Sequence, residues 1–326
     1  MQDRAARTRT GVIRPALKPE QEDPRVHVTL DRLRALEGQA RNISFLPRQP
    51  ARSVLNGRHA SRLRGRGLSF EELREYLPGD DIRVIDWKVT ARTGKPYVRV
   101  MTEERDRPAL IVVDQRMSMF FGSRLNMKAV TAAEAAALVA FRILDQGDRV
   151  GGVVFGDALI AEIRPQRTRA ALDRFLTALA DANAVLRADA PAVEPLPLTR
   201  ILRAVVRMAP RNHLVIVLSD FDMIDEEARR MISTVARRND LILGLVSDPF
   251  ADDLPTGLHL VASDGELQAE LDTGNRGVHR RLREMAQGRL AEILDLQRSL
   301  GVPVLPLTAA EETLPQIRRL MGLGPA

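Results

Sequence analysis

The sequence predicts an α/β protein with a mostly parallel, doubly wound sheet and a small loop- and β-rich satellite on its N-terminal side. From Ala109 onward, short apolar runs alternate with segments of helical periodicity, a pattern typical of a parallel sheet with helices on both faces. Two runs, ALIVVD (109–114) and HLVIVLSD (213–220), have the composition of strands buried on both faces. The stretch from Ser53 to Val100 contains turn residues and no long helical period, which predicts the satellite.

The individual elements follow from their periodicity and their end signals. The segment VTLDRLRALEGQA (28–40) predicts a short helix, and the apolar segment 125–147 predicts a long helix that ends at Gly147. Residues 149–163 predict a hairpin that turns at Gly156-Asp157. Further helices are expected at 168–180, 198–208, 225–238, 279–300 and 314–321, and further strands at 241–249 and 302–307. Together these elements predict three regions: a basic, partly disordered segment with one helix (1–47), the satellite (48–106) and the α/β domain (107–326).

Composition excludes several classes of protein. The 326 residues include 44% hydrophobic residues and no cysteine, so a disulfide framework and a thiolate metal site are both excluded. No apolar run approaches the roughly 20 residues that cross a bilayer, and the polar N-terminus lacks the apolar core of a secretory signal. We therefore expect a cytoplasmic protein without a membrane segment.

Positive charge is concentrated near the N-terminus. Residues 1–70 contain 15 Lys or Arg and 6 Asp or Glu, a balance of +9, whereas the whole chain has a net charge of +6. A basic segment of this kind can bind nucleic acid. The preferred interpretation is a solvated, partly disordered arm, because no aromatic residues are interleaved to stack on bases.

Two predicted strands end in aspartate. Asp114 ends the first strand and is followed by Ser118, and Asp220 follows Ser219 at the end of another. The carboxyl ends of parallel strands meet at one edge of a sheet, where α/β proteins bind their ligands. Carboxylates and hydroxyls there form a site suited to Mg²⁺, Mn²⁺ or Ca²⁺. The alternative is that these residues only cap the helices that follow.

The segment ALIVVDQRMSMFFGS (109–123) resembles the metal-ion-dependent adhesion motif of von Willebrand factor A domains, in which Asp-x-Ser-x-Ser ends the first central strand. The resemblance implies Mg²⁺ or another divalent cation held by Asp114, Ser118, Thr168 and Asp220. Arg116 departs from the motif, because it stands where the first serine belongs and a guanidinium cannot ligate a cation. Arg116 either pairs with Asp114 or Asp220 and closes the site, or points outward and leaves a reduced ligand set.

The segment GRGLSFEELREYLPGDDIRVIDWKVTARTGKPYVRV (65–100) resembles the signature of the bacterial DUF58 family, a domain of unknown function. The segments RVGGVVF, VIVLSDF and VSDPF with the following DDLP resemble the same family. Its members are typically encoded beside MoxR-type AAA+ ATPases, so the resemblance implies such an ATPase as partner in a chaperone-like or assembly role. The expected contact face comprises Asp114, Arg116, Ser118, Asp220 and Asp222.

The signature combines aromatic and charged residues. Trp87, Tyr76 and Tyr97 together with a run of Asp and Arg predict a small core whose charges pair at a junction with the α/β domain. A cation–π contact of Trp87 with Arg83 or Arg92 belongs to that prediction. The alternative is that the same charges form a docking face.

Enzyme motifs are missing from the sequence. It contains no phosphate-binding G-x-x-x-x-G-K-[ST] loop, no H-E-x-x-H and no G-x-S-x-G, and its five histidines are scattered. We therefore expect a protein that is not an enzyme and has no catalytic residues. Two other functions remain as alternatives: a metal-dependent hydrolase using Asp114 and Asp220, and nucleic-acid binding by the Arg-rich N-terminus.

Overall fold

The computed structural model describes residues 23–41, 58–59, 68–77, 80–104, 108–157, 160–190, 194–222, 224–251, 259–263, 268–272 and 276–320. The predicted disordered lead falls almost entirely outside these residues, as does the DDLP segment. In the part of the chain that is described, no helix is both long and apolar enough to cross a membrane.

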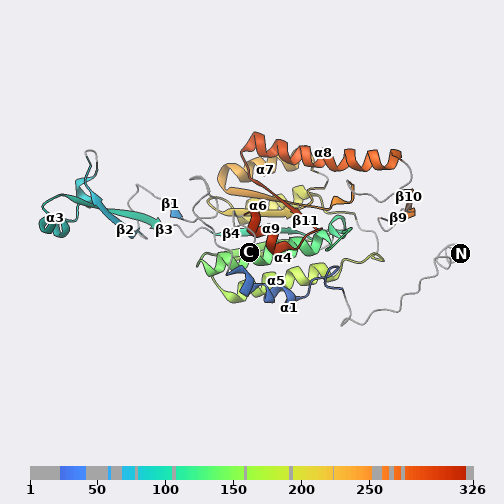
Figure 1. The fold of residues 1–326 in the computed structure, drawn as a ribbon, viewed down its shortest axis with the longest axis horizontal. Helices are drawn as coiled ribbons and strands as arrows, with labels where there is room; N and C mark the ends of the chain where they lie inside the picture. The colour runs from blue at the N-terminus through green and yellow to red at the C-terminus, as the bar shows by residue number, and fades with distance from the viewer. Residues whose placement is uncertain are drawn as a thin grey trace.

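A six-stranded sheet forms the centre of the molecule and confirms the predicted doubly wound architecture (Figure 1). Its order is β11-β8-β7-β4-β5-β6, and every neighbouring pair is parallel except the β5–β6 hairpin. The strands are β4 (Ala109–Asp114), β5 (Val150–Phe155), β6 (Ile160–Gln166), β7 (Leu214–Ser219), β8 (Asp240–Ser247) and β11 (Val304–Thr308). Because the chain winds outward in both directions from β4, the topological switch point lies between β4 and β7.

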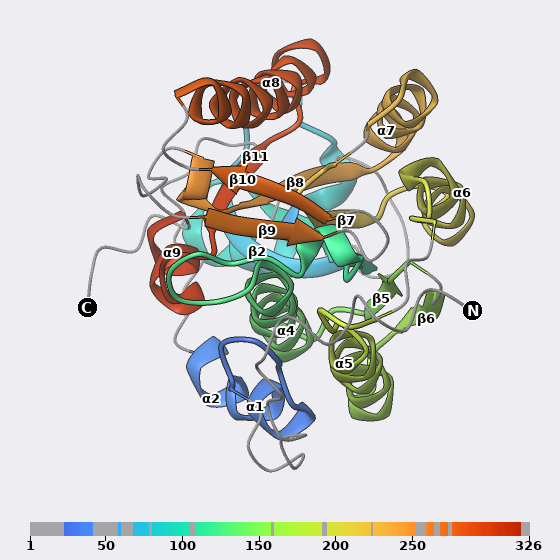
Figure 2. The same cartoon turned by 90° about the vertical axis from the view of Figure 1, so that its right-hand side faces the viewer.

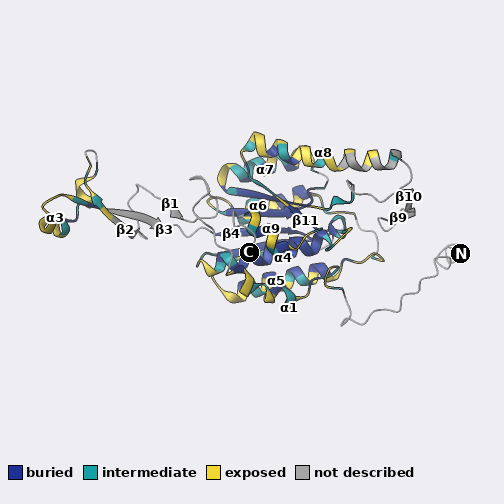
Figure 3. Cartoon of the chain, viewed as in Figure 1, coloured by how far each residue is buried: buried dark blue, intermediate teal, exposed yellow. Residues whose placement is uncertain are grey.

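Helices cover both faces of this sheet (Figure 2). One face is covered by α4 (Lys128–Asp145), α5 (Arg169–Ala184) and α9 (Thr313–Leu320). The other is covered by α6 (Leu198–Met208), α7 (Glu226–Arg238) and α8 (Arg276–Leu300). Residues of β4 and β7 are buried throughout (Figure 3), which explains why their sequences are apolar without alternation.

The short N-terminal helices belong to the sheet domain. The predicted helix over 28–40 is present as α1 (Leu30–Ala35) and α2 (Glu37–Ala40). Val28, Leu33 and Ala40 are buried in the same apolar cluster as α4 and α5. Asn183 of α5 accepts a hydrogen bond from the Val28 N–H at 2.8 Å. This segment was predicted to form a separate region, and the structure corrects that boundary, because its apolar face completes the core.

The satellite is a separate antiparallel sheet that extends away from the α/β domain (Figure 1). It has the order β1-β3-β2 and consists of β1 (Arg58–His59), β2 (Leu68–Glu75) and β3 (Tyr97–Glu104). A 3-10 turn (Ile82–Val84) and α3 (Trp87–Thr93) connect β2 to β3. Since only residues 105–108 separate the end of β3 from the first residue of β4, the satellite joins the α/β domain at the edge where the parallel strands begin.

One hairpin was not predicted. β9 (His259–Ser263) and β10 (Gln268–Asp272) pair antiparallel as a two-stranded sheet of their own. In Figure 1 this hairpin lies at the opposite end of the molecule from the satellite, near the start of α8. The structure therefore has two ends: the satellite at one and the carboxyl edge of the sheet, with this hairpin, at the other.

Candidate functional site

The switch point brings together the two strand-end aspartates. Asp114 is the last residue of β4, and Asp220 directly follows Ser219, the last residue of β7. The exposed fraction of the side chain is 0% for Asp114 and 3% for Asp220. Two carboxylates this deeply buried require partners, because an unpaired buried charge is strongly destabilising.

Asp114 is paired with a cation from its own loop. The guanidinium of Arg116 donates from Nη2 to Oδ2 of Asp114 at 2.8 Å and from Nε to Oδ1 at 3.1 Å. The backbone N–H of Arg116 also donates to Oδ1, at 3.0 Å, and the Ser219 hydroxyl donates to Oδ2 at 2.6 Å. Both oxygens of Asp114 are therefore occupied by donors from within the chain.

Arg116 is almost completely enclosed, with 2% of its surface exposed. Burial by itself lowers the pKa of this guanidinium, but the charge of Asp114 and the hydrogen bonds to it outweigh burial and raise the pKa. The guanidinium carbon lies 5.6 Å from the centroid of the buried Phe155 ring, within the range of a cation–π contact. Nη1 donates to the carbonyl of Leu196 at 3.3 Å, just before α6. Of the two orientations considered for Arg116, the structure has the inward one.

Asp220 is paired with a second cation, Lys128. The Nζ atom of Lys128 lies 2.7 Å from Oδ2 of Asp220. Lys128 is the first residue of α4 and is 7% exposed. A positive charge at the start of a helix opposes the helix dipole, so the contact with Asp220 is what stabilises it there. Burial by itself raises the pKa of Asp220, but the charge of Lys128 and its hydrogen bond lower it below the ordinary value.

The backbone after Asp220 has an unusual conformation. Phe221 has a φ of 53° and is buried, and a bulky residue rarely adopts this left-handed region. In this conformation the Phe221 N–H donates to the Ser219 hydroxyl at 2.9 Å, and the Asp222 N–H donates to Oδ1 of Asp220 at 3.1 Å. The strained turn therefore holds the second oxygen of Asp220 and orients the serine that binds Asp114.

The outer part of the site is less enclosed. Asp222 pairs with Arg289 of α8 at 2.5 Å, and each of these side chains is about one third exposed. Asp157, in the turn between β5 and β6, accepts a hydrogen bond from the Met117 N–H at 2.7 Å, and burial raises its pKa. Two buried oxygens have no hydrogen-bond partner among the described residues: Ser118 Oγ and Asp157 Oδ1.

Thr168 does not belong to this site. It lies just beyond Gln166, which pairs with Val150 at the beginning of β5, whereas Asp114 pairs with Phe155 at the end of β5. Since β6 runs antiparallel, it carries the chain to the opposite edge of the sheet. Thr168 caps α5 there by accepting a hydrogen bond from the Ala171 N–H. The predicted grouping of Thr168 with Asp114, Ser118 and Asp220 is therefore corrected.

The remaining donors do not fit a divalent metal ion. Both carboxylates of the predicted ligand set already bind a cation of the chain, and Arg116 stands in place of a hydroxyl ligand. No three His, Cys, Asp or Glu side chains come together as a metal site within the described ranges. One free hydroxyl and one free carboxylate oxygen are a poor set for Mg²⁺, which requires near-octahedral oxygen coordination.

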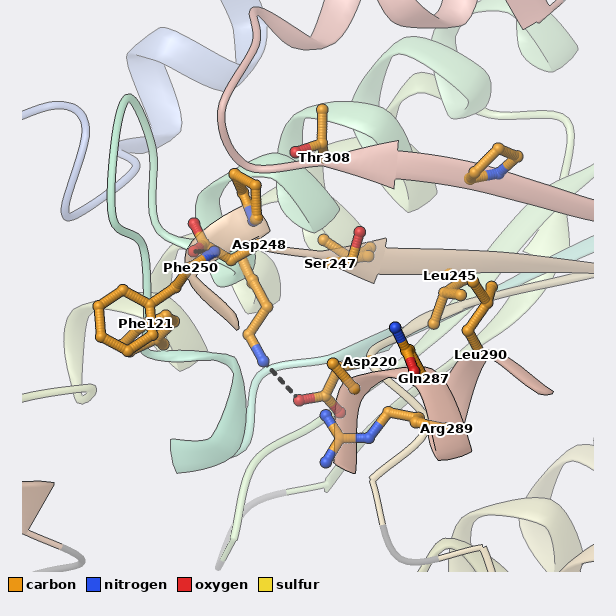
Figure 4. Close-up of a pocket in the computed structure, with 15 residues that line it drawn as sticks. Phe121, Asp220, Leu245, Ser247, Asp248, Phe250, Gln287, Arg289, Leu290 and Thr308 are labelled. Atoms are coloured by element: carbon orange, nitrogen blue, oxygen red, sulfur yellow. Dashed lines mark hydrogen bonds and ion pairs between the residues drawn. The ribbon is translucent and has the colours of Figure 1, made fainter. Parts of the chain in front are cut away.

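A cavity of about 470 Å³ opens beside Asp220 at the same edge of the sheet (Figure 4). The ends of β8 and β11 form one wall and α8 forms another. The Ser123 hydroxyl donates to Asp248 at 2.6 Å, which ties the loop after β4 to the loop after β8. The lining is mainly apolar and includes Phe121, Leu245, Leu290 and Pro306, with Lys128 and Arg289 as its cations.

Sequence reasoning missed two of the charged residues at this site. Lys128 left a local signal, because a lysine as the first residue of an otherwise apolar helix opposes the helix dipole. Arg289 left none, because it lies in the middle of a charged helix and only the tertiary fold brings it to Asp222. Gln115 was also missed, and its side chain accepts a hydrogen bond from Asn183 at 2.9 Å, which links the loop to α5.

Comparisons with known proteins found a family match, relatives by sequence and a similar solved structure. A family model described as "Protein of unknown function DUF58" matches residues 72–291. Uncharacterised proteins of Mycobacterium bovis and Mycobacterium tuberculosis are each 28% identical over 295 residues, which cover 88% of this chain and 89% of theirs. Among solved structures, a von Willebrand factor type A protein from Catenulispora acidiphila matches with a TM-score of 0.30 and 13% identity. That match covers 58% of this chain, which spans only 43% of the length of the other.

Proposed function

The chain belongs to the DUF58 family of proteins of unknown function, and we propose that it is a non-enzymatic interaction module that binds its partner at the carboxyl edge of the sheet without a metal ion. The observation that carries this proposal is the pair of internal ion pairs, Arg116 with Asp114 and Lys128 with Asp220. These ion pairs hold the side chains of Asp114 and Asp220 in place beside an apolar cavity. A preformed apolar cavity with a few fixed polar groups is suited to binding.

The same ion pairs weigh against the hydrolase alternative. A metal-dependent hydrolase would need Asp114 or Asp220 as a ligand or a general base, and both have their oxygens engaged by donors of the chain. Asp157 has a free oxygen, but within the described part of the chain it belongs to no group of three His, Cys, Asp or Glu side chains that could hold a metal ion. Nucleic-acid binding by the Arg-rich N-terminus concerns residues that lie mostly outside the described ranges.

The partner that we propose is a MoxR-type AAA+ ATPase, with a chaperone-like or assembly role in the cytoplasm. This choice rests on the resemblance to the family, whose members are typically encoded beside such ATPases. The chemistry of the edge supports a protein partner, because Phe121 and Leu290 are more than 40% exposed at the cavity. Arg289 and Asp222 beside them offer charged groups to the rim of an interface, and apolar residues surrounded by polar ones are the usual anatomy of protein interfaces.

Replacing Leu290 with aspartate is expected to abolish capture of the ATPase. The side chain is 45% exposed at the cavity, so the change adds a charge where an apolar side chain of the partner would be buried and leaves the core untouched. The measurement is co-purification of a MoxR-type ATPase of the same organism with tagged wild type and variant. Val185→Asp is the matched control, because Val185 is 61% exposed and lies at the end of α5, in the other helical layer. Equal capture by wild type and Leu290→Asp would refute binding at this edge.

A further inference from the structure

The end of the satellite exposes apolar side chains. We define the satellite tip as Leu77 together with residues 80–92, which include the 3-10 turn and the first turns of α3. Trp87 is 67% exposed, Ile82 64% and Leu77 59%. Val84 of the tip is 37% exposed, and the other exposed large apolar residues among those described are few: Leu73 on the satellite, and Phe121, Val185 and Leu290 elsewhere. Such a concentration of exposed apolar groups in one small unit marks an interaction site.

The carboxylates of the tip have partners within the satellite itself. Asp80 pairs with Arg74 at 2.7 Å and also accepts a hydrogen bond from the Leu77 N–H. Asp81 accepts from the Arg83 N–H and so begins the 3-10 turn, although its side chain remains exposed. Asp86 is buried and caps α3 through the N–H groups of its first residues. These acidic groups therefore hold the shape of the tip.

The cations of the tip, in contrast to its carboxylates, do not pair with other described residues. Arg83, Lys88 and Arg92 are exposed, and none of them forms an ion pair with a described residue. Asp81 is the exposed acid among them, so the outward-facing charge of the tip is positive. In the sequence, Trp87 lies between Arg83 and Lys88, and Ile82 lies directly before Arg83.

This arrangement replaces the predicted junction. The charges of the signature were expected to pair in a small core against the α/β domain, with Trp87 stacked on Arg83 or Arg92. In the structure Trp87 is mostly exposed, and the satellite extends away from the domain (Figure 1). The alternative prediction, in which the charges of the signature form a docking face, agrees with the exposure of Trp87 and of the cations Arg83, Lys88 and Arg92.

We propose that the satellite tip is a docking surface for an anionic lipid bilayer. Tryptophan and aliphatic side chains partition into the interfacial region of a bilayer, and neighbouring Lys and Arg are attracted to anionic headgroups. The tip lies at one end of the molecule (Figure 1), and its apolar side chains are exposed there, so a bilayer can contact them without a matching groove. Docking at this end would leave the carboxyl edge, at the opposite end, free for a protein partner.

The chain contains its own reporter for this proposal, because Trp87 is its only tryptophan. The full-length protein is titrated with vesicles of equal parts phosphatidylglycerol and phosphatidylcholine, and with vesicles of phosphatidylcholine alone. We expect co-sedimentation with the anionic vesicles, a blue shift of Trp87 emission and reduced quenching by acrylamide. Added salt should weaken the binding, since the attraction to headgroups is screened.

Two variants separate the apolar and the charged contributions. Ile82→Asp keeps the reporter and is expected to lower partitioning at least about tenfold. Arg83→Ala/Lys88→Ala/Arg92→Ala is expected to lower it about a hundredfold, because each cation near an anionic surface contributes roughly fivefold. Val185→Asp and Arg200→Ala/Arg211→Ala/Arg237→Ala are the matched controls, since they make the same kinds of change at exposed apolar and basic residues on other surfaces. Circular dichroism confirms that each variant is folded.

Every other outcome overturns the proposal. Co-sedimentation without a blue shift would place the lipid contact elsewhere, for example on the basic N-terminal residues. Equal binding to the neutral vesicles would show that the cations of the tip do not contribute to binding. A blue shift that depends on protein concentration without vesicles would show that a second copy of the chain covers the tip instead.

Discussion

Asp114→Ala is expected to lower the free energy of unfolding by about 3–5 kcal/mol, because it leaves the buried Arg116 charge without its partner. Arg116 is 2% exposed, and its principal hydrogen bonds go to Asp114. The Ser219 hydroxyl loses its acceptor as well. Urea unfolding followed by circular dichroism measures this loss. Trp87 fluorescence is unsuitable here, since Trp87 lies on the satellite.

Two controls define the cause of that loss. Asp189→Ala removes one partner of an exposed ion pair, Arg187–Asp189, and should leave the free energy of unfolding almost unchanged. The double variant Asp114→Ala/Arg116→Met removes both buried charges and should cost clearly less than the sum of the single changes. An open metal site without its ion would respond in the opposite way, because removing one of two repelling carboxylates would stabilise the fold. A gain in stability for Asp114→Ala would therefore contradict the internal ion pair.

Lys128→Met is expected to be similarly destabilising at neutral pH, and its effect should depend on pH. In the wild type the folded-state pKa of Asp220 lies below its ordinary value because of Lys128. The pair therefore contributes stability above the unfolded pKa of about 3.9, and this contribution is lost as the pH falls through the folded pKa. In the variant, burial remains the largest influence on Asp220 and is expected to raise its pKa, because only the Asp222 N–H and the charge of Arg289 still oppose it. The charged carboxylate is then unfavourable at neutral pH and is relieved by protonation.

The difference in unfolding free energy between wild type and Lys128→Met should accordingly shrink as the pH is lowered from 7 to about 4. Urea unfolding at several pH values measures it. Lys95→Met is the control, because the Lys95–Glu75 pair is exposed and should show a small difference at every pH. A difference for Lys128→Met that stays constant over this range would show that Asp220 does not depend on Lys128 for its charge.

Much of the fold was predictable from local sequence. Helices α4, α7 and α9 and strands β4, β7 and β8 lie within a few residues of their predicted positions, because apolar runs and end signals act locally. The two strand-end aspartates also met at one edge, as the rule for parallel strands requires. The position of Thr168 was not predictable in this way. It depended on the antiparallel direction of β6, which reverses the edge at which the following loop emerges.

The ion-pair partners of the two aspartates could not be predicted from the sequence either. Arg116 could be identified as a departure from the adhesion motif, but only its burial and its contacts with Asp114 and Leu196 determine which way it points. Lys128 and Arg289 come from helices distant in sequence from the aspartates that they bind. On the satellite, alternating charges and aromatic residues were consistent with either a core or an exposed face, and the exposure of Trp87 decides between them.

Calorimetric titration of Mn²⁺ into the wild-type protein tests the central proposal most directly. If Arg116 and Lys128 occupy the positions of a cation, the wild type should give no saturable heat. Arg116→Ser restores a hydroxyl and frees Asp114, and this variant is expected to bind the ion. Saturable one-to-one binding of Mn²⁺ by the wild type would contradict the account, because it would show that the carboxylates of Asp114 and Asp220 are available to a metal.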